Sequence, residues 1–127
     1  MKIGLIEDNV QAVELMQSMI REHFPDLEYV GAAATLKEGQ DLIRKNSPDI
    51  LLVDIQLRDC SSFELLESLS PCDLEGASLI FITAHGTMEN VYKALRMSAI
   101  DYLIKPIDEK HFIAAIEEAM ESGESLN

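Results

Sequence analysis

Short runs of aliphatic residues alternate along this chain with segments in which apolar residues recur every three or four positions. The runs Lys2–Ile6, Leu27–Ala33, Asp49–Val53, Leu79–Thr83 and Ile100–Ile104 predict five strands. Nearly continuous apolar runs of this length are typical of parallel strands that are covered on both faces. The second run is less hydrophobic than the others, which predicts a strand at the edge of the sheet.

The five segments with helical spacing have recognisable start and stop residues. Candidate N-caps are Asp8 or Asn9, Thr35, Ser61 or Ser62, and Asp108, and the fourth helical segment covers about Thr87–Met97. Candidate ends are His23, Ser47-Pro48, Ser70-Pro71, Met97 and Gly123. This alternation predicts an α/β fold, a doubly wound five-stranded parallel sheet with five helices. Residues 1–122 are expected to form one domain, followed by a short C-terminal tail at 123–127.

One helical stripe allows two interpretations. Met88, Val91, Tyr92 and Leu95 recur at helical spacing. The simpler interpretation is that they are mostly core, because a covering helix needs one apolar face. The alternative is that part of the stripe is exposed for a partner.

Composition narrows the class of partner. The formal net charge of −13 opposes direct binding of nucleic acid, which requires a basic surface. No apolar run is long enough to span a membrane, and the N-terminus enters a strand without a signal peptide, so we expect a cytoplasmic protein. Cys60 and Cys72 lack the spacing of a metal site or disulfide framework and are expected to be reduced bystanders.

Residues with usable chemistry stand at the ends of the predicted strands. Glu7 and Asp8 follow the first strand, Asp54 the third, Thr83 ends the fourth, and Lys105 follows the fifth. Parallel strands deliver their carboxyl ends to one edge of the sheet, where ligands bind. Clustered carboxylates repel one another unless a cation offsets them, and Mg²⁺ prefers oxygen ligands. A carboxylate that forms an aspartyl-phosphate would also gain from a nearby lysine and hydroxyl.

Each of these residues also has an ordinary explanation. Glu7 and Asp8 could serve only the N-terminus of a helix, where negative charge is favourable. Thr83 and Lys105, taken singly, resemble an ordinary strand residue and a solvated lysine. Asp54 at a second strand end favours a shared site over these separate explanations.

Four segments together carry a family resemblance. They are Leu5-Ile6-Glu7-Asp8-Asn9, Leu52-Val53-Asp54, Phe81-Ile82-Thr83-Ala84 and Asp101-Tyr102-Leu103-Ile104-Lys105-Pro106. In this order and separation the chain resembles the receiver domain of bacterial two-component response regulators, over nearly its whole length. The segments around Asp54 and Lys105 are most similar to receivers attached to LytTR-type DNA-binding domains. The resemblance implies the flavodoxin-like strand order 2-1-3-4-5.

The resemblance also implies a role for each matching residue. Asp54 would accept a phosphoryl group from a sensor histidine kinase or a phosphotransfer protein. Mg²⁺, with Mn²⁺ as a substitute, would be held by Glu7, Asp8, Asp54 and the backbone carbonyl of Gln56, with Glu7 acting mostly through water. The phosphoryl-binding and switch residues would be Thr83, Ala84, Tyr102 and Lys105, and the peptide bond before Pro106 would be cis. The switched surface would then act on an output domain or partner protein, and homodimerisation is plausible for the family.

The loop after the acceptor departs from the family pattern. Arg58 stands where many relatives have proline, and Ser62 where many have glycine. The sequence therefore does not determine the conformation of this loop. Gln56 and His85 occupy positions at which family members tune dephosphorylation.

Three alternatives to a phosphorylation switch follow from the same residues. The altered loop could leave a receiver-like module that only binds a partner or dimerises. A Mg²⁺-dependent phosphohydrolase would use Asp54 as nucleophile, but the residue two positions on is Gln56, which cannot transfer a proton. A flavin-binding protein shares the expected fold, but the acidic rim would repel the flavin phosphate. We therefore expect a signalling module with only slow self-phosphorylation and self-dephosphorylation at Asp54, and not a turnover enzyme.

Overall fold

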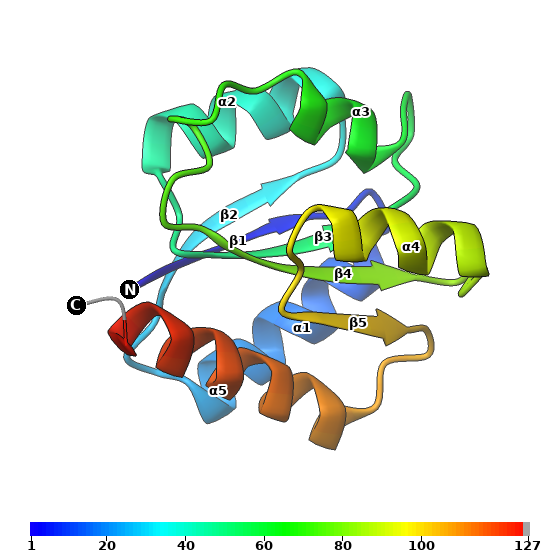
Figure 1. Cartoon of the computed structure of the whole chain (residues 1–127). Coiled ribbons are helices and arrows are strands. Elements are labelled where there is room, and N and C mark those ends of the chain that lie inside the picture. Colours follow the sequence, from blue (N-terminus) through cyan, green and yellow to red (C-terminus); the bar gives the residue numbers. More distant parts are fainter. Residues whose placement is uncertain (126–127) are drawn as a thin grey trace.

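A five-stranded parallel sheet forms the centre of the protein (Figure 1). The structure is a computed structural model and describes residues 1–125. The strands are β1 (Lys2–Ile6), β2 (Glu28–Ala33), β3 (Ile50–Asp54), β4 (Ser78–Thr83) and β5 (Asp101–Ile104). They lie in the order β2-β1-β3-β4-β5, all parallel, which confirms the predicted fold and its strand order. The prediction that the second strand lies at an edge is confirmed as well.

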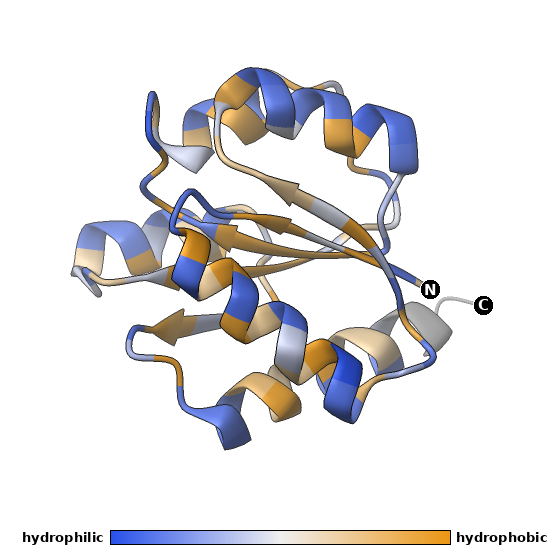
Figure 2. Ribbon diagram, turned by 180° about the vertical axis from the view of Figure 1, so that it is seen from behind, coloured by the Kyte–Doolittle hydropathy of each residue, from blue (hydrophilic) through white to orange (hydrophobic). Residues whose placement is uncertain are grey.

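Helices cover both faces of the sheet. They are α1 (Val10–His23), α2 (Leu36–Asn46), α3 (Ser62–Glu67), α4 (Met88–Arg96) and α5 (Glu109–Ser125). One buried cluster joins α1 and α5 to the sheet, and a second joins α2, α3 and α4 to the opposite face. Figure 1 shows these two helical layers, and Figure 2 shows the apolar strands between helices striped in blue and orange. A sheet covered twice explains why β3 is buried at every position.

Side-chain caps fix where most helices begin. Asn9, and not Asp8, caps α1, because its Oδ1 accepts a hydrogen bond from the Ala12 backbone N–H at 2.9 Å. Thr35, Ser61 and Thr87 cap α2, α3 and α4 in the same way. Asp108 accepts from the His111 N–H at 3.3 Å at the start of α5. Such caps satisfy N–H groups that have no partner within the helix.

Two predicted helix ends are wrong. Helix α3 ends at Glu67 and not at Ser70-Pro71, because the Ser68 hydroxyl donates to the Leu65 carbonyl oxygen in competition with the helical ladder. Helix α5 continues through Gly123 to Ser125, since a single glycine weakens a helix without ending it. The predicted tail at 123–127 therefore begins inside α5, and its last two residues lie outside the described part of the chain. The domain boundary itself stays a prediction.

The simpler interpretation of the α4 stripe is wrong. Met88, Tyr92 and Leu95 are 83%, 62% and 67% exposed. The helix is instead turned so that half-buried Val91 and buried Ala94 face the sheet. Helix α4 thus combines an inner contact made through small or branched residues with an outer apolar stripe.

Within the described residues, every helix is too short or too polar to cross a lipid bilayer.

Candidate phosphoacceptor and metal site

The carboxyl ends of four strands bring the predicted site residues to one edge of the sheet, where the arrowheads in Figure 1 point. Asp54 ends β3 and Thr83 ends β4, while Glu7 and Lys105 directly follow β1 and β5. Glu7, Asp54 and Thr83 are only 2%, 6% and 2% exposed. Polar groups buried to this degree need partners, so their contacts are informative about function.

Lys105 lies between the two buried carboxylates. Its Nζ is 2.8 Å from Asp54 Oδ2 and 2.6 Å from Glu7 Oε1. Only the contact with Asp54 has hydrogen-bond geometry, so Glu7 Oε1 is buried without a hydrogen bond. The other oxygens face backbone donors: Glu7 Oε2 accepts from Asn9 N–H at 3.1 Å, and Asp54 Oδ1 from Gln56 N–H at 3.0 Å. One cation therefore serves two acids.

Burial and the closeness of these three charged groups shift the pKa values of Glu7 and Lys105. Burial, and then the adjacent Asp54 carboxylate, raise the pKa of Glu7 to about 7, although Lys105 and the Asn9 N–H act in the opposite direction. Burial alone would lower the pKa of Lys105, but the adjacent Asp54 and Glu7 outweigh it and leave that pKa raised. Lys105 is therefore charged at neutral pH, while Glu7 titrates close to it.

The carboxylates of Glu7, Asp8 and Asp54 fit a divalent cation. Each offers an oxygen atom, and these three atoms lie within 4.8 Å of one another. Glu7 Oε1 is buried and has no hydrogen bond, but it is ion-paired with Lys105 at 2.6 Å, so a metal would share this carboxylate with the lysine. A set made only of oxygen donors suits Mg²⁺ better than a softer metal. Gln56, the fourth predicted ligand, is an exposed neighbour whose backbone N–H contacts Asp54.

The Thr83 hydroxyl is tied to the loop that leads into α4. Thr83 Oγ1 accepts a hydrogen bond from the His85 backbone N–H at 3.1 Å. The His85 carbonyl oxygen in turn accepts from the Asn90 side-chain amide at 3.1 Å. Ala84 and His85 are themselves exposed. Any movement of the Thr83 hydroxyl is thus linked through two hydrogen bonds to the first turn of α4.

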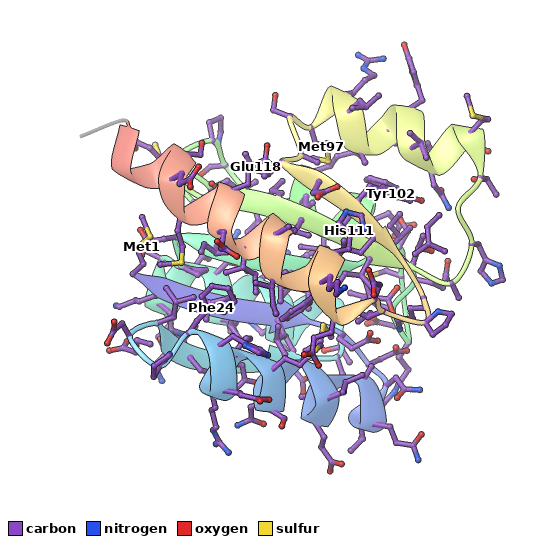
Figure 3. All side chains as sticks on the ribbon, turned by 90° about the horizontal axis from the view of Figure 1, so that it is seen from below. Met1, Phe24, Met97, Tyr102, His111 and Glu118 are labelled. Carbon is purple, nitrogen blue, oxygen red and sulfur yellow. The ribbon has the colours of Figure 1, made fainter. Side chains whose placement is uncertain are left out.

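Tyr102 lies on β5 beside α4 (Figure 3). It lines a small cavity of about 180 Å³ together with Val91 and Leu95 of that helix. Its hydroxyl is buried without a hydrogen-bond partner in the described structure, and burial raises its pKa. The peptide bond between Lys105 and Pro106 is cis, the isomer that the resemblance implies.

The loop after Asp54 keeps an ordered turn despite its two departures. The Leu57 N–H donates to the Cys60 carbonyl oxygen at 2.9 Å. Ser62 does not require the left-handed conformation that glycine would favour, because its φ is not positive. Its side chain is completely buried, with a hydroxyl that has no hydrogen-bond partner among the described residues. Cys60 and Cys72 are both free thiols.

Comparison with known proteins decides the family. The family described as "Response regulator receiver domain" matches residues 3–117 of this chain. The chain belongs to this receiver family. The motifs that suggested it all fall within the matched range.

Relatives of this receiver include regulators from several bacteria. The transcriptional regulatory protein CitB of Klebsiella pneumoniae is 32% identical over 103 residues, which are 81% of this chain and 43% of that protein. The sensory transduction protein LytT of Enterococcus faecalis is 30% identical over 127 residues, covering 99% of this chain and 51% of that protein. The chain thus spans about half the length of these curated relatives. The LytT similarity is compatible with the LytTR-type expectation.

A solved structure supports the fold independently. The CheY-like receiver domain protein from Methanospirillum hungatei has a TM-score of 0.85 and 26% sequence identity to this receiver. The match covers 99% of this chain and 98% of that one. The receiver fold is therefore that of a signalling module.

Sequence reasoning missed two contacts around the receiver site. Asn90 holds the loop after Thr83, and Asp59 Oδ1 accepts from the Leu36 N–H at 3.2 Å, which joins the loop after Asp54 to α2. No sequence pattern distinguishes these two side chains from ordinary polar surface residues. Both are recognisable only when their distant partners are in place.

Proposed function

We propose that this chain is the phosphoacceptor receiver of a two-component system, in which Asp54 takes a phosphoryl group from a sensor histidine kinase or phosphotransfer protein. The observation that carries the proposal is the buried Asp54 carboxylate, which lies 2.8 Å from Lys105 and close to Glu7 and Asp8. A cation and a cluster of metal-type ligands, both next to Asp54, suit a group that must meet phosphoryl oxygens.

The transfer is a substitution at phosphorus. An Asp54 carboxylate oxygen forms the new bond to phosphorus, and the bond from phosphorus to the donor histidine nitrogen breaks, its electron pair leaving with the imidazole. Mg²⁺ bound by Glu7, Asp8 and Asp54 would neutralise negative charge on the phosphoryl oxygens. Lys105, 2.8 Å from Asp54 Oδ2, would contribute further positive charge.

Phosphorylation would then act on the protein surface through Thr83 and Tyr102. The Thr83 hydroxyl would leave the His85 N–H to donate to a phosphoryl oxygen. Tyr102, whose hydroxyl is unpartnered, would change rotamer beside α4. The shift between two states would alter the surface of α4, β5 and α5 for an output domain or partner protein. We further propose that the domain works in the cytoplasm and does not contact nucleic acid directly.

Incubation with Mg²⁺ and acetyl phosphate, followed by intact mass measurement at short times, tests the acceptor role. The parent should gain one phosphoryl group, whereas an Asp54→Asn variant and an EDTA control should gain none. An established receiver should be labelled in parallel. Failure of the parent alone would favour the module that only binds a partner, while rapid phosphate release would favour a hydrolase.

A further inference from the structure

The tip of the loop after Asp54 has a fixed position. Gln56 and Ser61 form an isolated antiparallel bridge at its base. At the tip, Asp59 Oδ1 accepts from the Leu36 N–H at the start of α2. The neighbouring residue, Arg58, is therefore presented from an anchored turn although the proline common at its position is absent.

Arg58 lines an acidic hollow beside the site. The hollow has a volume of about 360 Å³, and its charged lining residues are Glu7, Asp8, Glu14, Glu38 and Arg58. Arg58 is exposed and makes no ion pair within 4.0 Å to any residue that the structure describes. Its guanidinium is thus available to a ligand.

Lys105 and Arg58, the two cations near the site, differ in whether they are ion-paired. Lys105 is committed to Asp54 and Glu7, at 2.8 and 2.6 Å. The hollow reaches the site at Glu7 and Asp8, and Arg58 is the one cation among its lining residues. Guanidinium groups bind phosphoryl oxygens through two parallel hydrogen bonds, a geometry that lysine cannot reproduce.

We propose that Arg58 binds the phosphoryl group of the incoming donor before transfer to Asp54. This inference rests on the proposed function and adds a donor-binding residue at a position where many receivers have proline. No bond at Arg58 forms or breaks, since the Asp54 oxygen still forms the new bond to phosphorus. The recognised chemistry is the phosphoryl group itself, whether carried on nitrogen or on an acyl oxygen.

The test is the initial rate of Asp54 phosphorylation as a function of donor concentration, followed by intact mass at saturating Mg²⁺ and constant ionic strength. Acetyl phosphate and phosphoramidate serve as the acyl and nitrogen donors. Arg58→Gln should raise the half-saturating concentration of both donors about fivefold or more, because a charge-assisted hydrogen bond is lost. Arg58→Lys should recover part of the loss. Lys45→Gln is the matched control and should behave like the parent, since Lys45 is an exposed cation in the last turn of α2 that makes no ion pair with any described residue.

Separate outcomes distinguish the possible failures. Arg58→Gln within twofold of the parent would overturn the role of Arg58 and leave the acceptor role of Asp54 intact. A defect with acetyl phosphate alone would overturn phosphoryl recognition, because it would place the contact on the acetyl group. A defect that follows weaker Mg²⁺ binding would also overturn it, since removing a positive charge beside Asp8 should leave Mg²⁺ affinity equal or higher. Absence of any adduct on the parent would contradict both proposals. Thermal melts should show that the exposed substitution leaves the fold unchanged.

Discussion

Two regions of this receiver depart from the usual distribution of side chains in opposite ways. At the carboxyl edge of the sheet, Glu7 and Asp54 are acidic yet buried around Lys105. On the outer face of α4, Met88, Tyr92 and Leu95 are apolar yet exposed. Burial makes the charged form of Glu7 unfavourable, as its raised pKa indicates, whereas the second region leaves hydrophobic area in water. Both features are typical of binding or functional surfaces.

Removal of Lys105 should produce the largest effect on the buried acids. Lys105→Met is expected to lower the free energy of unfolding by about 2 kcal/mol at pH 8 without metal, because two buried carboxylates lose their shared cation. The loss should be smaller at pH 6, where Glu7 holds a proton. Urea denaturation at the two pH values measures both effects. Equal stability of variant and parent at pH 8 would show that the acids do not depend on Lys105.

Neutralising Glu7 should raise the free energy of unfolding of the metal-free protein, whereas removing Lys105 lowers it. A carboxyl whose folded pKa of about 7 lies above its unfolded value of 4.5 binds protons more tightly in the folded state. The destabilisation that it causes therefore grows as the pH rises from about 4.5 to about 7, and it reaches its full size above about pH 7. Glu7→Gln should stabilise the metal-free protein by roughly 2 kcal/mol at pH 8, and the gain should disappear near pH 4.5. A gain that did not change with pH would contradict titration of Glu7 as its cause.

The charge of Asp8 should destabilise the metal-free fold less than that of Glu7, because Asp8 is only half-buried. Asp8→Asn is expected to stabilise the metal-free fold by about 1 kcal/mol, because one of three neighbouring carboxylates loses its charge. The same change should weaken Mg²⁺ binding by about tenfold. Thermal melts with and without Mg²⁺ report both quantities. A variant clearly less stable than the parent without metal would be inconsistent with repulsion among these acids.

The exposed face of α4 should show the smallest effect on folding. Leu95→Gln is expected to change the free energy of unfolding by less than about 0.5 kcal/mol, because Leu95 is 67% exposed. For comparison, Leu65→Ala at a fully buried leucine of α3 should lower the free energy of unfolding by about 2–5 kcal/mol. Chemical denaturation of the two variants makes the comparison. A large loss for Leu95→Gln would assign this stripe to the core after all.

The sheet, and the residues that lie together at its carboxyl edge, could be predicted because both depend on local sequence patterns. Apolar runs at β1, β3 and β4 can be satisfied only between two helical layers, and their parallel arrangement brings Asp8, Asp54 and Thr83 to one edge. Strand limits differed from prediction by a single residue, as at β3, where Ile50–Asp54 replaces Asp49–Val53. Helix ends were less predictable. The competing Ser68 hydroxyl and the continuation through Gly123 depend on small local energy differences.

The sequence by itself determined which residues are candidates for the chemistry of this protein, since residue type and position at the strand ends identify the carboxylates, the lysine and the hydroxyl. Only the tertiary structure decided how far each of these side chains is buried and which residues it contacts. Burial around Glu7 raises its pKa, the rotation of α4 exposes Tyr92, and the anchored turn brings Arg58 to the acidic hollow. These properties arise from contacts between residues far apart in the chain, and a pattern read along the sequence contains no distances between them.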